Sequence, residues 1–215
     1  MIDLYLMSVS EAKRLPAHFC RTWFPRRFER AEKLYMRDNT LSSIAGGALI
    51  AGVLGVKESE ISFGRWGKPY LTGGGRHFSL SHSGGYALLA VSDGDIGADI
   101  EAPGACRENV ARRAFTADEL EWMSADPDGR FLELWTAKES LLKLDGRGLS
   151  LEMQSFSVLE LIGGGSVSFG GRQVFGYSAV HDGYRLSLCA YEKPASPRLS
   201  AVTAEMIPEL ATKNV

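Results

Sequence analysis

The chain has 215 residues, of which 45% are hydrophobic and 23% charged, and its 24 basic and 26 acidic residues give a formal net charge of −2. These proportions are typical of a folded globular protein, and the balanced charge argues against a nucleic-acid-binding protein, which would carry a strong basic excess. The three cysteines, Cys20, Cys106 and Cys189, are far apart, so they indicate neither a disulfide framework nor a zinc cluster.

The first predicted element is a short buried strand over 2–9. This N-terminal segment lacks the basic start and the long apolar run of a signal peptide. The most apolar stretch, 44–56, is shorter than the roughly 20 residues that a membrane span needs, and we interpret it as part of a buried helix. Together with the unpaired cysteines, these features predict a cytoplasmic protein without a membrane partner.

The rest of the first half alternates helical and strand-like segments. In chain order we expect basic helical segments up to residue 37, a core helix over 41–54, short strands over 61–63 and 69–71, and longer strands over 78–81 and 86–91 joined by a Ser-Gly-Gly turn at 83–85.

The second half repeats this order. A strand over 96–101 precedes a helix that begins at Thr116, where Thr116 and Glu119 fit a capping box. We then expect a long helix over 129–144, strands over 155–161, 174–180 and 184–191, and a tail in which 201–211 is either a docking helix or a frayed end. The repetition predicts an α+β fold of two similar lobes, related by pseudo-twofold symmetry, with the junction near residues 93–95.

The hexapeptide Ile-Gly-Ala-Asp-Ile-Glu at 96–101 carries the first chemical signal. Because side chains alternate between the faces of a strand, Asp99 and Glu101 share the face opposite the apolar residues. One interpretation is a half-exposed strand with solvated acids. The other is a cation site, since a bound cation would relieve the repulsion between two adjacent carboxylates.

The second signal is the run Trp-Thr-Ala-Lys-Glu-Ser-Leu-Leu-Lys at 135–143. On a helix, Trp135, Glu139 and Lys143 are four residues apart and lie on one face. Taken alone, this pattern is also compatible with an amphipathic helix that carries a surface Glu–Lys pair, which contributes only a few tenths of a kcal/mol.

The third signal combines Gly-Lys-Pro at 67–69 with Phe-Ser-Leu-Ser-His-Ser at 78–83. The latter is no serine hydrolase elbow, because the Gly-x-Ser-x-Gly pattern is missing. The former is no phosphate-binding P-loop, because its spacing is wrong and a proline follows the lysine.

In this order, the three signals strongly resemble the 4′-phosphopantetheinyl transferase family, and the length and double-lobed layout resemble its Sfp-type, monomeric branch. The resemblance extends over about 27–192. It implies the transfer of the phosphopantetheine arm of coenzyme A to a serine of an apo acyl or peptidyl carrier protein, with release of 3′,5′-bisphosphoadenosine. It also implies that lobe 1–95 contributes coenzyme A contacts and lobe 96–215 carries the metal site and catalytic helix.

The resemblance assigns roles to individual residues, which group as metal ligands, catalytic residues and coenzyme A contacts. The implied magnesium ligands are Asp99, Glu101 and Glu139, and three carboxylates also suit manganese. The implied catalytic residues are Glu139 and Lys143, although a metal-held water is an alternative to Glu139 as the base. The implied coenzyme A contacts are Lys68, Ser81, His82, Arg27 and Arg30.

One position departs from the family pattern. Relatives often carry an arginine near the start of the core helix, where this chain has Ser42, and Arg37 is a candidate replacement. Arg107, Arg112 and Arg113 form a candidate surface for an acidic carrier protein, with a solvated helix face as the alternative. A non-catalytic module that binds coenzyme A or a carrier protein is the second candidate function, although the complete acidic set favours the enzyme.

Overall fold

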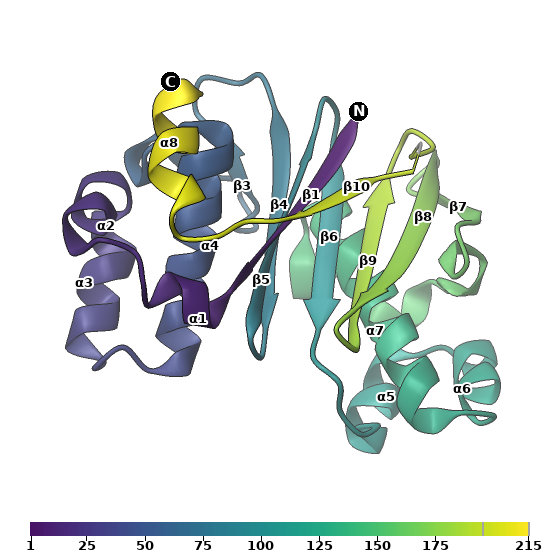
Figure 1. The fold of residues 1–215 in the computed structure, drawn as a ribbon. Coiled ribbons are helices and arrows are strands. Elements are labelled where there is room, and N and C mark those ends of the chain that lie inside the picture. The colour runs from purple at the N-terminus through teal and green to yellow at the C-terminus, as the bar shows by residue number, and fades with distance from the viewer. Residues whose placement is uncertain (195, 215) are drawn as a thin grey trace.

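The structure, a computed structural model, describes residues 1–194 and 196–214. Two four-stranded sheets lie back to back at its centre, and helices cover their outer faces (Figure 1). The sheet of the first half has the strand order β10-β1-β5-β4, and the sheet of the second half has the order β6-β9-β8-β7. The predicted α+β class with antiparallel sheets is confirmed, while the pseudo-twofold relation of the lobes stays a prediction.

The first half contains every helical segment and strand expected from the sequence. Its elements are β1 (Ile2–Ser8), α1 (Val9–Ala12), α2 (Ala17–Trp23), α3 (Pro25–Lys33), α4 (Asp38–Leu54), a 3₁₀ turn η1 (Glu58–Glu60), β2 (Ile61–Phe63), β3 (Pro69–Leu71), β4 (His77–Ser83) and β5 (Tyr86–Ser92). The strands β2 and β3 form a separate hairpin beside the main sheet.

The second half carries the long helix of the site. Its elements are β6 (Ile96–Glu101), α5 (Glu108–Ala114), α6 (Ala117–Met123), α7 (Pro127–Asp145), the 3₁₀ turns η2 (Gly148–Ser150), η3 (Met153–Ser155) and η4 (Leu159–Leu161), β7 (Ser166–Phe169), β8 (Arg172–His181), β9 (Tyr184–Ala190), β10 (Arg198–Ala201) and α8 (Met206–Lys213). The capping box that starts α6 is confirmed, because Thr116 and Glu119 exchange the expected hydrogen bonds.

Three apolar layers hold these elements together. One lies between the first sheet and its helices, and another lies between α7 and the second sheet. The third lies between the two sheets and joins β1 and β5 to β6 and β9 through buried aliphatic side chains such as Leu4, Leu88, Ile100 and Leu188. In the described part of the chain, no helix is both long and apolar enough to cross a membrane.

The predicted strand over 155–161 is wrong, because this segment forms the 3₁₀ turns η3 and η4. Its backbone groups bond to a buried ion pair instead of a neighbouring strand. Lys138 Nζ donates to the carbonyls of Met153 (2.7 Å) and Phe156 (2.6 Å), and the amide of Val158 donates to Glu119 Oε1 (2.7 Å). The edge of the sheet is formed instead by β7, which the sequence pattern did not predict.

The C-terminal segment returns to the first half of the chain. Strand β10 pairs in parallel with β1, and α8 lies on α4 (Figure 1). Ile207 and Ala211 of α8 are fully buried in the first apolar layer. Of the two alternatives for this tail, the docking helix is therefore the one observed. The division into lobes at residues 95 and 96 stays a prediction, and 198–213 packs with the first half.

Candidate functional site

The two sheets meet at their edge strands, β4 and β6, through side chains rather than a backbone ladder. Alternate residues of β4 face β6, and all three are serines: Ser79, Ser81 and Ser83. The hydroxyl of Ser81 donates to Asp99 Oδ1 (2.6 Å), and that of Ser83 donates to Glu101 Oε2 (2.6 Å). Asp99 and Glu101 thus share one face of β6, as strand alternation predicts, and serine hydroxyls of β4 orient both carboxylates.

Helix α7 packs directly on β6 because residue 97 is a glycine. A Cβ atom at Gly97 would lie 2.0 Å from the carbonyl oxygen of Ser140 and 2.3 Å from the amide nitrogen of Leu144. These are backbone atoms, so a side chain here would push the helix away from the strand. This close approach brings Glu139 and Lys143 of α7 to the carboxylates of β6.

Asp99 is the most enclosed group of the site, with 4% of its surface exposed. Its Oδ1 atom accepts a hydrogen bond from Lys143 Nζ at 2.6 Å, and the same ammonium group donates to Ser81 Oγ at 2.8 Å. Its Oδ2 atom is buried and has no partner within the described residues. The interpretation of Asp99 as a solvated acid is therefore wrong. The alternative of a surface pair between Glu139 and Lys143 is also wrong, because Lys143 pairs with Asp99 instead.

Both carboxylate oxygens of Glu101 are held by hydrogen-bond donors. Ser83 binds Oε2, and Trp135 Nε1 donates to Oε1 at 3.1 Å. Trp135 belongs to α7, so Glu101 is fixed between strand β4 and the long helix. The face of α7 that carries Trp135 is therefore packed against β6, as a large aromatic side chain at this position implies.

Glu139 is half-buried and lines a pocket of about 280 Å³ together with Trp66, Lys68 and Lys143. Burial raises the pKa of its carboxyl group, and the nearby charges of Asp99 and Glu101 raise it further, against the opposing effect of Lys143. Within residues 1–194 and 196–214, the Glu139 side chain makes no hydrogen bond or ion pair. Its carboxylate is therefore available to a ligand in the pocket.

The carboxylates of Asp99, Glu101 and Glu139 are the candidate metal ligands. As the described side chains stand, no three His, Cys, Asp or Glu residues form a metal-binding group. The donor chemistry nevertheless fits a hard divalent cation, which prefers oxygen ligands. The buried Oδ2 atom of Asp99 has no hydrogen-bond partner among the described residues, and burial together with the charges of Asp99 and Glu101 raises the pKa of Glu139 despite the opposing effect of Lys143.

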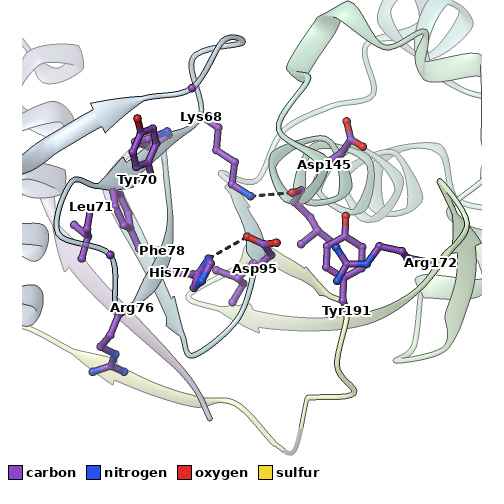
Figure 2. Close-up of a pocket in the computed structure, with 16 residues that line it drawn as sticks. Lys68, Tyr70, Leu71, Arg76, His77, Phe78, Asp95, Asp145, Arg172 and Tyr191 are labelled. Atoms are coloured by element: carbon purple, nitrogen blue, oxygen red, sulfur yellow. Dashed lines mark hydrogen bonds and ion pairs between the residues drawn. The ribbon is translucent and has the colours of Figure 1, made fainter.

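Lys68 connects the hairpin β2–β3 to the end of α7. Its ammonium group donates to the carbonyl oxygen of Leu144 at 2.8 Å, an arrangement that the helix dipole favours. Burial lowers the pKa of Lys68, against the opposing charges of Asp95 and Asp145. Figure 2 shows this bond on the wall of a second pocket of about 490 Å³, across which His77 pairs with Asp95 at 3.0 Å. Lys68 therefore lies between the two pockets.

The remaining predicted coenzyme A contacts lie on β4 and α3. Desolvation lowers the pKa of His82, and the cations Lys143 and Arg27 lower it further. Arg27 is half-buried, and its Nη1 atom donates to Ser43 Oγ at 3.3 Å. Arg30 is exposed on α3, so the structure brings Arg27 but not Arg30 into electrostatic contact with His82.

Comparison with known proteins identifies the family. A sequence profile described as the 4′-phosphopantetheinyl transferase superfamily matches residues 95–189. The 4′-phosphopantetheinyl transferase Sfp of Bacillus subtilis (strain 168) is 30% identical over 181 residues, which cover 77% of this chain and 81% of the relative. The chain belongs to the 4′-phosphopantetheinyl transferase superfamily.

Two further relatives agree with this assignment to the phosphopantetheinyl transferases. A 4′-phosphopantetheinyl transferase of Bacillus subtilis is 36% identical over 141 residues, or 60% of this chain and 63% of the relative, so the chain spans less than two thirds of that protein. An L-aminoadipate-semialdehyde dehydrogenase-phosphopantetheinyl transferase of Xenopus laevis is 36% identical over 109 residues, or 41% of this chain and 35% of the relative. The resemblance to the Sfp-type branch of the superfamily is thus confirmed.

The position that departs from the phosphopantetheinyl transferase pattern is now located. Ser42 is buried in the first turns of α4, with 4% of its surface exposed. Arg37 is exposed at the N-terminal cap of the same helix. Its replacement of the family arginine stays a prediction.

The arginines proposed to meet a carrier protein are exposed. The Arg107 guanidinium lies 5.4 Å from the ring centres of both Phe131 and Trp135, and Arg112 and Arg113 lie on α5. Arg107 therefore connects this surface to the tryptophan that binds Glu101.

Sequence reasoning missed the contribution of Ser83 to the site. Its signal was available, because serines at 79, 81 and 83 alternate along a strand and therefore share one face. The partners of that face depend on how the two sheets pack together, which no local sequence pattern predicts.

Proposed function

We propose that this protein transfers the 4′-phosphopantetheine group of coenzyme A to a serine of an apo acyl or peptidyl carrier protein and releases 3′,5′-bisphosphoadenosine. Membership of the superfamily supports this function. The observation that carries it is the cluster of Asp99, Glu101, Glu139 and Lys143 at the junction of β6 and α7, beside a pocket that also reaches Lys68. The cluster combines metal-type oxygen donors with cations that attract phosphate.

Asp99, Glu101 and Glu139 would hold Mg²⁺, or Mn²⁺ in its place. When bound, such an ion neutralises charge on the pyrophosphate of coenzyme A and on the leaving group. The support for a cation here is the unpartnered, buried Oδ2 atom of Asp99 and the excess of carboxylates over ammonium groups.

The chain's own residues perform binding and proton transfer in this proposal. Lys143, Lys68 and His82 bind phosphate oxygens, and Arg27 supports them from α3. The serine oxygen of the carrier protein forms a bond to the pantetheine-linked phosphorus, and the bond from that phosphorus to the bisphosphoadenosine oxygen breaks. The serine proton passes to Glu139, whose raised pKa suits a base, or to a water in the cluster.

The decisive experiment is incubation of purified apo carrier proteins with coenzyme A, Mg²⁺ and this protein, followed by mass spectrometry. We expect a mass increase equal to one phosphopantetheine group on acyl or peptidyl carriers, and none with Glu139→Gln. Tight binding of coenzyme A or carrier without modification would instead establish the non-catalytic module. Gel filtration of the same preparation tests the expected monomer.

A further inference from the structure

A contact between two hairpins of opposite lobes lies beside Glu101. The turn between β4 and β5 touches Tyr184 at the start of β9, and the amide of Gly85 donates to the Tyr184 hydroxyl oxygen at 2.8 Å. Gly84 fits under the same hydroxyl, since a Cβ atom there would lie 2.7 Å from it. Its φ of +51° also favours glycine. The turn is therefore shaped around the tyrosine hydroxyl.

Aromatic packing fixes the position of Tyr184 relative to that turn. The rings of Tyr86 and Tyr184 meet edge to face at 5.0 Å and 86°, a favoured arrangement. The Tyr86 hydroxyl donates to Asp182 Oδ2 at 2.7 Å on the exposed side of the contact. The β4–β5 hairpin supplies Tyr86, and the β8–β9 hairpin supplies Tyr184 and Asp182. The contact therefore joins the two sheets.

The turn is directly connected to the carboxylate cluster through Ser83. Ser83 is the last residue of β4 and precedes the two glycines of the turn. Its hydroxyl accepts a hydrogen bond from the amide of Ala102 (3.1 Å) and donates to Glu101 Oε2 (2.6 Å). A displacement of the turn would move this hydroxyl away from Glu101.

We propose that Tyr184 is a positioning residue for the transfer reaction: its hydroxyl fixes the β4–β5 turn so that Ser83 holds Glu101 in the orientation that binds the metal. Tyr184 lies outside the sequence motifs of the site and acts through Gly85 and Ser83 rather than on the substrate. This inference rests on the proposed function and on the proposed role of Glu101 as a metal ligand.

The test is direct Mn²⁺ binding, measured by electron paramagnetic resonance on the full chain with and without coenzyme A. Tyr184→Phe keeps the ring and removes only the hydroxyl. We expect it to weaken Mn²⁺ binding by about three- to tenfold, the effect of one lost neutral hydrogen bond. The Mn²⁺ concentration for half-maximal transfer should rise by the same factor, while the KM for coenzyme A at saturating Mn²⁺ stays unchanged. Tyr86→Phe, which removes a hydroxyl from the same contact without touching Gly85, should bind Mn²⁺ as the wild type does.

A double-mutant cycle distinguishes this role from general stabilisation. Ser83→Ala should weaken Mn²⁺ binding, and adding Tyr184→Phe should weaken it no further, because both act on Glu101 through one contact. Unchanged Mn²⁺ affinity in Tyr184→Phe, additive effects in the double variant, or a wild-type protein that binds no Mn²⁺ would overturn the proposal. A wild-type protein that binds Mn²⁺ but modifies no carrier would refute the enzymatic function alone, and the binding data would still decide the role of Tyr184.

Discussion

The ammonium group of Lys143 lies 2.6 Å from Asp99 Oδ1, which joins the long helix α7 to the edge strand β6. The Asp99 side chain is 6% exposed and that of Lys143 is 28% exposed, so the pair lies at the inner end of the site. Lys143 thus offsets part of the negative charge of the carboxylate cluster. The same ammonium group is the proposed phosphate ligand, so one lysine would serve both the packing of the cluster and the proposed reaction.

Replacing Lys143 with methionine should expose this dual role. The Lys143→Met variant leaves Asp99 buried with fewer partners, which should lower the free energy of unfolding by about 1–3 kcal/mol without metal. Because the cluster is then more negative, Mg²⁺ should raise the melting temperature of the variant more than that of the wild type. Differential scanning fluorimetry with and without Mg²⁺ measures both effects. An equal Mg²⁺ response in the two proteins would contradict a metal site next to Lys143.

Removal of the Lys68 ammonium group should weaken coenzyme A binding. A charged hydrogen bond of this kind contributes about 1.5–3 kcal/mol, so Lys68→Ala should raise the calorimetric dissociation constant by roughly ten- to a hundredfold. Arg65→Ala is the matched control, because Arg65 is an exposed cation of the same hairpin and stacks on Trp66. Equal losses in the two variants would indicate general electrostatic attraction instead of a Lys68 contact.

Lys138 should matter for stability and not for chemistry, although it belongs to the same motif as Glu139. Its side chain is fully buried, and its ammonium group lies 2.9 Å from the equally buried Glu119. Lys138→Met leaves that carboxylate uncompensated and should lower the free energy of unfolding by about 3–5 kcal/mol. Urea denaturation measures this loss. The double variant with Glu119→Leu should regain part of it, and a further loss in the double variant would argue against the ion pair as the cause.

A side chain at Gly97 should be unfavourable, because backbone atoms of α7 occupy the space where its Cβ atom would lie. We expect Gly97→Ala to destabilise the protein by about 1–3 kcal/mol through overpacking and to reduce transfer activity more than stability alone explains, since Glu139 and Lys143 move with the helix. Gly94→Ala is the control, because a Cβ atom at Gly94 meets nothing within 4 Å. Thermal denaturation and the carrier-modification assay measure the two effects. A Gly97→Ala protein as active as Gly94→Ala would show that the close approach is dispensable.

Local patterns in the sequence are sufficient for much of this fold. Strand alternation places Asp99 and Glu101 on one face, and the Thr116–Glu119 pair marks the start of α6. The strand predicted over 155–161 fails for a physical reason, because the partners of its backbone are the side chains of Lys138 and Glu119, distant in sequence. No local periodicity reports such partners.

The site shows the same limit. The residue types that carry the chemistry are visible in three short motifs, but the pairing of Lys143 with Asp99 instead of Glu139 depends on how closely α7 approaches β6. The contact of Ser83 with Glu101 and the proposed role of Tyr184 depend on contacts between the two sheets, whose geometry follows from packing.

The return of the C-terminal segment to the first half has a consequence for the contact between the two sheets. Strand β10 adds to β1, the amide of Ala204 donates to Glu11 Oε2 at 2.7 Å, and Asn214 Nδ2 donates to the carbonyl oxygen of Gly52 at 3.0 Å. The two sheets are therefore connected twice along the chain, once at 93–95 and once by the segment between β9 and β10. After a single cut at 93–95, β1 would belong to the first fragment and β10 to the second. Their pairing would keep the two fragments attached through one shared sheet. The contact between the two sheets should therefore survive a single cut at this connection.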